Sequence, residues 1–301
     1  MDPSALIHLL PAVRPVALQA EAERVAAIRS DRWIGYPRAR QALATLDALL
    51  THPQRQRMPH LLIIGPTNNG KSMIIEKFRR DHPSVARRPD EPDQIPVLAV
   101  QMPSGPDIKR FYALILSSMG VPTYPNHSLA HQEDHTRYML HTLGVRILVI
   151  DEVHNLLAGP VPRQREFLNL LRFLGNELKI ALVCVGIREA YLAIRHDTQL
   201  ENRFEPFALP LWEDDAHYAS LLASFEAVLP RRRPSHLSAP PLATSVLART
   251  EGTIGETTTL LTRAAIRAVE TGQEAIDRAV LEAVDDHAPS ARRRLFEGLL
   301  A

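Results

Sequence analysis

Residues 61–72 read Leu61-Leu62-Ile63-Ile64-Gly65-Pro66-Thr67-Asn68-Asn69-Gly70-Lys71-Ser72, an apolar run that breaks into a glycine-bounded loop and ends in Lys-Ser. The spacing is that of a P-loop, G-x-x-x-x-G-K-S. Its glycines let backbone N–H groups turn toward phosphates, Lys71 can reach the β and γ phosphates, and the Ser72 hydroxyl can ligate Mg²⁺. The helical pattern that follows would aim its N-terminus at the nucleotide. The stretch predicts a phosphate site between a buried strand and a helix, the alternative being a plain surface turn.

A second stretch, about eighty residues further on, has the pattern of a Walker B segment. It reads Arg146-Ile147-Leu148-Val149-Ile150-Asp151-Glu152, a buried strand that ends in two carboxylates. Asp151 at the strand end can hold Mg²⁺ through water, and Glu152 can polarise a water for attack on the γ-phosphate. The alternative is two solvated acids that cap the following helix. Together the two motifs predict ATP binding with Mg²⁺ at Ser72 and Asp151, and catalytic roles for Lys71 and Glu152.

The predicted nucleotide contacts extend beyond these residues. Within the loop and the first helical turn they are Gly65, Pro66, Thr67, Asn68, Asn69, Gly70, Lys71, Ser72 and Met73. Upstream, Trp33-Ile34-Gly35-Tyr36-Pro37 precedes a helix predicted over residues 38–50. Ile34 and Tyr36 would form a flat apolar wall for an adenine ring, although aromatic side chains before a helix also serve in plain packing. Both interpretations stay open.

Composition bounds the class of protein. The 301 residues are 45% hydrophobic and 23% charged, which is ordinary for a soluble globular chain of about two domains. No apolar run approaches the roughly 18 residues of a membrane helix, and the N-terminus lacks the pattern of a signal peptide, so we expect a cytoplasmic protein with no membrane partner. Cys184, the single cysteine, lies in an apolar strand and is expected to be a buried thiol.

The chain as a whole carries almost no net charge. The net charge is +1, from 35 basic and 34 acidic residues, so any contact with nucleic acid must be local. The histidines His127, His131, His135 and His141 suggest a metal site at first sight. Apart from Glu133 and Asp134, no cysteine or acidic pair stands at the spacing of metal ligands, so solvated or capping histidines are the preferred interpretation.

The order of predicted elements indicates the fold. Strands alternate with helices up to about residue 210, which argues for an α/β fold with a mostly parallel, doubly wound sheet and the nucleotide at the strand carboxyl ends. Beyond that point only helices are expected, over residues 213–229, 241–249, 254–271 and 273–286. The predicted segments are an N-terminal helical extension (1–30), an ATPase core (31–212), a helical lid (213–286) and a basic C-terminal tail (287–301).

This order of elements resembles the AAA+ P-loop ATPases, and four segments resemble one family within them. The segments are residues 33–37, 62–72, 166–178 and 199–206, which include the sequences GPTNNGK and Glu201-Asn202-Arg203-Phe204-Glu205-Pro206. They are similar to those of TniB, the ATPase of a class of bacterial transposons, which is related to TnsC and MuB. The resemblance spans roughly residues 30 to 300.

The resemblance implies a function and partners. Such proteins bind double-stranded DNA as ATP-dependent homo-oligomers, as a ring or a helical filament, and link target choice to a DDE transposase and a TniQ-type targeting protein. It also implies an arginine finger at Arg203, which follows the post-sheet helix; the alternative is an ion pair with Glu201 or Glu205. Lys109 and Arg110 are expected on the DNA-facing side, or else they only cap or solvate their helix.

Two departures from the family pattern imply slow hydrolysis. Relatives end the strand after Walker B with a polar sensor residue after glycine, whereas Ile187 follows Gly186 here and cannot hydrogen-bond a phosphate or a water. Residues 251–256 lack the arginine that many AAA+ proteins place in the lid. Two other functions remain open: a general AAA+ loader or remodeller of a protein partner, and a scaffold switch that holds ATP without turnover.

Overall fold

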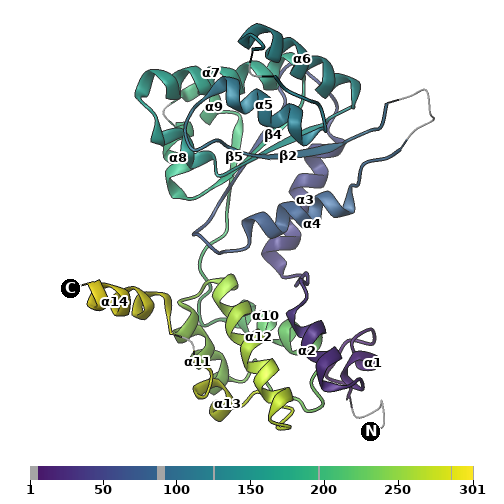
Figure 1. Ribbon diagram of the computed structural model, residues 1–301, viewed down its shortest axis with the longest axis vertical. Coiled ribbons are helices and arrows are strands. Elements are labelled where there is room, and N and C mark those ends of the chain that lie inside the picture. Colours follow the sequence, from purple (N-terminus) through teal and green to yellow (C-terminus); the bar gives the residue numbers. More distant parts are fainter. Residues whose placement is uncertain (1–5, 87–91, 125, 196, 286, 301) are drawn as a thin grey trace. The chain divides into compact units, whose positions relative to one another are not determined.

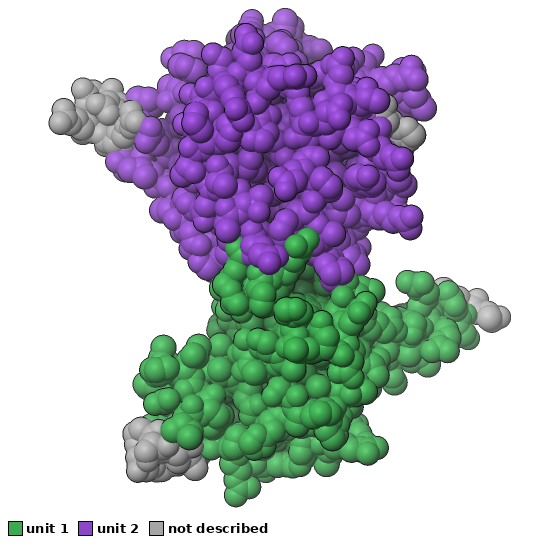
Figure 2. Space-filling model, turned by 180° about the vertical axis from the view of Figure 1, so that it is seen from behind, with its two compact units in different colours: residues 1–40, 68–70, 211–301 green, residues 41–67, 71–210 purple. Residues whose placement is uncertain are grey.

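The computed structural model describes residues 6–86, 92–124, 126–195, 197–285 and 287–300. Small parts of the predicted extension, lid and tail therefore lie outside the described residues: 1–5, 286 and 301. The chain divides into two compact units (Figure 2). Unit 1 comprises Met1–Arg40, Asn68–Gly70 and Leu211–Ala301, and unit 2 comprises Gln41–Thr67 and Lys71–Pro210.

Unit 2 is built on a parallel sheet. Its strands are β1 (His60–Ile64), β2 (Val97–Gln101), β3 (Ile147–Asp151), β4 (Ala181–Gly186) and β5 (Phe204–Ala208). They lie in the order β2-β3-β4-β1-β5, and every pairing is parallel. The predicted sheet is thus confirmed. Because β4 is inserted between β1 and β3, the P-loop strand and the Walker B strand are not neighbours.

Helices cover both faces of this sheet (Figure 1). They are α3 (Pro37–Thr51, in this unit from Gln41), α4 (Lys71–Asp81), α5 (Ile108–Ser118), α6 (Leu129–Thr142), the 3₁₀ helix η2 (Val153–Ala158), α7 (Val161–Glu177), α8 (Arg188–Arg195) and α9 (Thr198–Glu201). Alternate strand residues such as Leu62, Leu148 and Leu182 form one buried cluster with side chains of α5, α6 and α7. Burial on both faces explains why β1 to β4 read as largely apolar runs, whereas β5 at the edge of the sheet is partly exposed.

Unit 1 is helical in the part of it that the structure describes. Its helices are α1 (Arg14–Ala17), α2 (Glu21–Arg29), α10 (Ala216–Val228), α11 (Pro240–Thr250), α12 (Ile254–Glu270), α13 (Arg278–Glu282) and α14 (Pro289–Leu300). The α2 helix packs on α12, and the Leu10 N–H donates to the Ala227 carbonyl at 2.9 Å. The N-terminal segment that the sequence suggested as an extension therefore folds together with the C-terminal helices.

An ion pair joins these two segments of unit 1. The Arg24 side chain is 2% exposed, and its guanidinium pairs with the Glu274 carboxylate, with Nη1 to Oε1 at 2.9 Å. The Arg232 N–H also donates to Glu274, at 3.1 Å. Removing one partner from a buried pair typically costs about 3–5 kcal/mol, since the other charge is left uncompensated. This contact accordingly ties residues near the N-terminus to the loop after α12.

The same loop corrects one sequence prediction. The predicted helix over residues 273–286 is wrong, because only Arg278–Glu282 is helical among the described residues of that range, 273–285. Gly272 and Glu274 both have positive φ, at 70° and 65°, which interrupts a helix. The helix begins late because Asp277 caps it, its side chain accepting the Val280 N–H at 2.8 Å.

Two further sequence predictions concern apolar segments. Cys184 is fully buried in β4, and burial raises the pKa of its thiol, as expected for an inert core cysteine. Of the helices in the described part of the chain, none has both the length and the apolar character that crossing a bilayer requires.

Candidate nucleotide site and active site

The P-loop follows β1 directly and is shaped by two glycines. A β-carbon on Gly65 would lie 2.8 Å from the Leu209 carbonyl oxygen, a contact too close for any other residue. Gly70 has φ of +81°, a conformation that side chains disfavour. The α4 helix then begins at Lys71. The loop thus has the strand, turn and helix context that a phosphate-binding loop requires.

Lys71 is held inside the loop. Its side chain is 6% exposed, and Nζ donates to the carbonyls of Gly65 at 2.8 Å and Pro66 at 2.7 Å. Burial lowers the pKa of Lys71, while the carboxylates of Glu152 and Asp151 act in the opposite direction. The ammonium therefore lies at the turn of the loop and within the electrostatic field of both Walker B acids.

Ser72 and Asp151 are in contact, although β1, which leads into the P-loop, and β3, which ends at Asp151, are not adjacent strands. The Ser72 Oγ donates to Asp151 Oδ2 at 2.8 Å, and Asp151 Oδ1 accepts the Glu152 N–H at 2.8 Å. A hydroxyl and a carboxylate are oxygen donors of the kind Mg²⁺ prefers, so this pair fits the predicted cation. Ser72 lies at the N-terminus of α4 and Asp151 at the end of β3, and these two ends lie next to each other. The distance between the two side chains could not be predicted from their spacing in the sequence.

Glu152 has an unusual backbone. Its φ is 56°, in the left-handed region that non-glycine residues seldom adopt and that clusters at functional sites. Its side chain is 38% exposed, and Oε2 lies 3.2 Å from Nε2 of His154. A carboxylate that is accessible and near a phosphate loop can serve as the water-polarising base that the sequence predicts.

His154 is a residue that sequence analysis did not single out. It occupies the second position of η2, and its Nδ1 is buried. Its proximity to Glu152 depends on the backbone path after β3, so the two-residue spacing in the sequence is only a weak signal of this contact. Ile187 follows the last residue of β4, as the sequence order implies.

Arg203 lies at the edge of the sheet opposite to the P-loop. It directly precedes β5, and its carbonyl accepts the N–H of His60, the first residue of β1. The P-loop follows the other end of β1, about 15 Å away at 3.3 Å per residue. An arginine side chain cannot span that distance, so Arg203 cannot act on the nucleotide of its own P-loop.

The local partner of Arg203 is an amide. Its Nη1 donates to Oδ1 of Asn176 at 2.5 Å, whereas Glu201 pairs with Arg195 at 3.7 Å. No ion pair to Glu201 or Glu205 was found for Arg203 among the described residues, so the alternative interpretation of an internal ion pair loses its support. Desolvation, with Arg57 and Arg172 nearby, lowers the pKa of Arg203.

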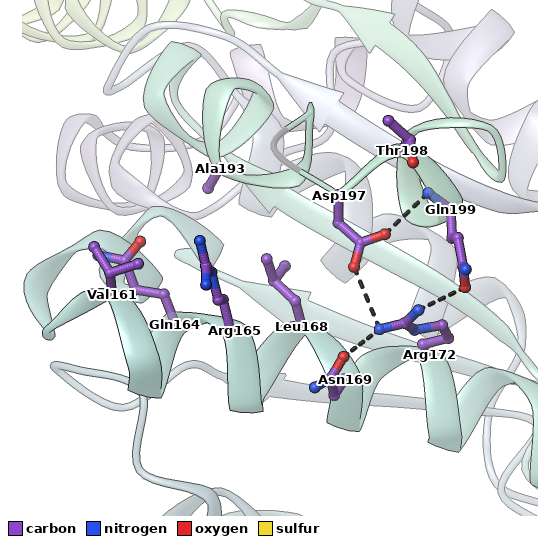
Figure 3. Close-up of a pocket in the computed structure, with 10 residues that line it drawn as sticks. All are labelled: Val161, Gln164, Arg165, Leu168, Asn169, Arg172, Ala193, Asp197, Thr198 and Gln199. Atoms are coloured by element: carbon purple, nitrogen blue, oxygen red, sulfur yellow. Dashed lines mark hydrogen bonds and ion pairs between the residues drawn. The ribbon is translucent and has the colours of Figure 1, made fainter.

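Arg172, in contrast, is fully engaged in its own unit. It lies on α7 at a pocket of about 590 Å³ (Figure 3). Its guanidinium donates to Gln199 Oε1 at 2.5 Å and to Asn169 Oδ1, and lies 3.4 Å from Asp197. Figure 3 shows these partners converging on its head group. The side chain of Arg203, with one described hydrogen bond, has fewer described partners than that of Arg172, and its role as a finger remains a prediction.

Lys109 and Arg110 are exposed in the first turn of α5. The Asp107 side chain caps this helix and accepts the Arg110 N–H at 2.9 Å, so neither basic side chain serves as the cap. Cations at a helix N-terminus oppose the helix dipole by about 0.3–1 kcal/mol. The pair therefore adds nothing to the stability of this helix through the dipole, and a DNA-facing role for Lys109 and Arg110 remains a prediction.

Three histidine rings lie one after another near Lys109. The His127 and His131 rings lie 4.4 Å apart, and those of His131 and His135 lie 5.9 Å apart. The pKa of His127 is lowered by desolvation and by the charges of His131, His135 and Lys109. Among the described residues, no group of three or more His, Cys, Asp or Glu side chains is placed to hold a metal ion.

The predicted adenine wall and the middle of the P-loop belong to unit 1. Tyr36 is 6% exposed and packs edge to face on Trp212, with centroids 5.1 Å apart, and burial raises its pKa to about 12. Ile34 is also buried. Both residues are packed in the structure, and an adenine role for them remains a prediction.

Arg292 pairs with Glu256, in the segment 251–256 that contains no arginine of its own. Asn68 donates through Nδ2 to Glu256 Oε1 at 3.3 Å, within unit 1. The same carboxylate pairs with Arg292 of α14 at 2.6 Å. The basic tail therefore supplies a positive charge next to residues 251–256, which could not be inferred because α14 lies more than thirty residues further along.

The remaining predicted nucleotide contacts lie in the P-loop and in the first turn of α4. Pro66, Thr67, Ser72 and Met73 are exposed, whereas Asn69 is buried, its Oδ1 accepting the Ile254 N–H at 3.4 Å. These placements are compatible with backbone contacts to phosphates, and each assignment stays a prediction.

The parallel order, the loop after β1 and the acids after β3 define a P-loop ATPase fold of the AAA+ class. Solved structures agree. The Aeropyrum pernix ORC1 protein in complex with DNA matches at 15% identity with a TM-score of 0.53, covering 90% of this chain and 69% of that one. The ADPNP-ADP complexes of Aeropyrum pernix ORC2 match at 15% identity with a TM-score of 0.55, covering 85% of this chain and 70% of that one. Thermotoga maritima RuvB matches at 14% identity with a TM-score of 0.52, covering 85% of this chain and 71% of that one. Such low identities establish the fold alone.

The chain belongs to the TniB family. The sequence profile described as "Bacterial TniB protein" matches residues 24–214, which confirms the resemblance seen in the motifs. No curated protein matches the chain.

Proposed function

We propose that this protein is an ATP-dependent, DNA-binding regulator of DNA transposition. The observation that carries the proposal is the convergence of Lys71, Ser72, Asp151 and Glu152 at one end of a parallel sheet in a chain of the TniB family. In this proposal the protein works in the cytoplasm with a DDE transposase and a TniQ-type targeting protein. It assembles on target DNA and links target choice to the transposase.

The site residues divide the proposed chemistry among them. Ser72 and Asp151 would hold Mg²⁺, which screens phosphate charge when bound. Lys71 leaves the carbonyls of Gly65 and Pro66 for the phosphate oxygens, exchanging neutral acceptors for charged ones. Glu152 orients the attacking water and accepts a proton from it as general base. With Ile187 at the sensor position, hydrolysis is slow, so ATP acts as a timer on an assembled state.

Measurements of turnover distinguish this function from its two alternatives. DNA-stimulated hydrolysis supports the regulator of transposition. Stimulation by a protein partner alone supports a loader or remodeller, and hydrolysis that stays at background with both supports the scaffold switch. The specific observation in favour of the switch is the apolar Ile187.

A mixing experiment tests the proposed finger. Arg203→Ala should lose most of its turnover, because an arginine finger is worth about 10³- to 10⁵-fold in phosphoryl transfer. Mixing it with Glu152→Gln should restore activity, since the Glu152→Gln subunit supplies an intact arginine to the Arg203→Ala site. Arg195→Ala, an exposed arginine paired with Glu201, is the control and should keep its turnover. A mixture as inactive as its components would assign Arg203 a structural role.

A salt series tests the proposed DNA surface. Lys109→Ala with Arg110→Ala should weaken ATP-dependent DNA binding and make the salt slope shallower by about 0.9 for each phosphate that a subunit no longer neutralises. Small contributions add along an oligomer, so the effect on affinity should be large. The matched control is Arg79→Ala with Arg80→Ala, a pair of exposed arginines at the end of α4. Unchanged affinity and slope in the first variant would exclude this surface.

A further inference from the structure

The imidazole of His154 contacts the carboxylate of Glu152. His154 Nε2 lies 3.2 Å from Glu152 Oε2, and the two side chains are 22% and 38% exposed. Both residues belong to unit 2 and follow β3 directly. The contact forms where the backbone leaves β3, at the left-handed residue Glu152 with φ of 56°.

The imidazole is oriented by its surroundings. Nδ1 is buried and lacks a hydrogen-bond partner among the described residues. A β-carbon on Gly186 would lie 3.5 Å from this nitrogen, so the ring packs against the carboxyl end of β4. With Nδ1 facing this contact, the nitrogen available for a hydrogen bond is Nε2, and it faces Glu152. The geometry therefore favours a proton on Nε2 that is donated to the carboxylate.

The place of the ring matters because of Ile187. The residue after Gly186 carries no polar atom, yet His154 reaches the end of the same strand from the neighbouring 3₁₀ helix. A glutamate side chain that is 38% exposed has several rotamers available, and only some of them direct an oxygen at a given water. A fixed donor at 3.2 Å selects among these rotamers.

We propose that His154 is a positioning residue that holds the Glu152 carboxylate in its productive orientation and supplies the polar group that Ile187 cannot. The inference rests on the proposed ATPase function for its kinetic consequence. The contact itself can be tested independently.

The kinetic test compares an alanine variant with two amide replacements of different length. His154→Ala should lower kcat about 10- to 100-fold, as expected when a reacting group loses its alignment. His154→Gln, whose amide nitrogen can reach the place of Nε2, should recover much of this loss, whereas the shorter His154→Asn should not. Affinity for a fluorescent ATP analogue and the thermal unfolding midpoint should stay at parent values in all three variants. His217→Gln, an exposed histidine of unit 1, is the matched control.

A spectroscopic test does not depend on turnover. Side-chain ¹⁵N NMR should show His154 with its proton on Nε2, the signal being assigned by its absence from the His154→Gln spectrum. Glu152→Ala should shift this signal and leave those of the other histidines in place.

The outcomes separate the two levels of the account. A parent protein without turnover would overturn the proposed function, while a shifted NMR signal would still support the contact. Parent-like kcat in His154→Ala, or a higher one, would overturn the positioning role. So would equal rates in the glutamine and asparagine variants, or a His154 signal that does not respond to Glu152→Ala.

Discussion

Replacing Glu152 by glutamine is expected to leave ATP binding intact and to lower turnover by about 10²- to 10⁴-fold, the usual contribution of a general base. The amide has nearly the same shape as the carboxylate but cannot draw a proton from water. The side chain is 38% exposed, so the substitution buries no new polar group and should not affect folding. The measurement is steady-state phosphate release, together with the affinity for a fluorescent ATP analogue.

Glu166→Gln is the control for this prediction, because Glu166 is an exposed acid on α7. It should hydrolyse ATP at the parent rate. Parent-rate hydrolysis by Glu152→Gln itself would show that another group activates the water.

Replacing Lys71 by alanine is expected to abolish nucleotide binding. Its ammonium is the side-chain charge that the loop itself supplies, and it is already within 2.8 Å of the Gly65 and Pro66 carbonyls at the turn. A hydrogen bond between charged groups contributes about 1.5–3 kcal/mol, and Lys71 can make more than one to the phosphates. Binding of a fluorescent ATP analogue measures the loss.

The control for this second prediction is Lys77→Ala, which removes a lysine of the same helix that pairs with Asp81. It should bind nucleotide like the parent. If Lys71→Ala unfolds at the parent temperature and still binds ATP, phosphate recognition by this loop is contradicted.

The core of the fold was predictable because its signals are local. Four of the five strands read as unbroken apolar runs, since a parallel sheet is buried on both faces, and the glycines and Lys-Ser of the P-loop have fixed spacing. The insertion of β4 between β1 and β3 was not predictable from the residues alone. It depends on which strands pair, and the contact of Ser72 with Asp151 across that insertion depends on it too.

The details that were missed depend on long-range packing or on single backbone angles. Arg24 and Glu274 are 250 residues apart, so nothing in the sequence links the N-terminal segment to the loop after α12. The predicted helix over residues 273–286 failed because positive φ at Glu274 and the cap at Asp277 outweighed helical periodicity. The contact of His154 with Glu152 was not predictable, because it depends on how the backbone turns after β3.

The central claim is that ATP drives assembly of this protein on duplex DNA. The proposed finger at Arg203 lies too far from its own P-loop, so the proposal requires a heterologous interface, which gives a ring if the rotation closes and a helix if it does not. The most direct test is electron microscopy of the parent protein with linear duplex DNA at low salt, in ATP with Mg²⁺ and separately in ADP with Mg²⁺. We predict regular rings or helical filaments on the DNA with ATP, and few or none with ADP. Isolated particles and undecorated DNA in ATP would contradict the account.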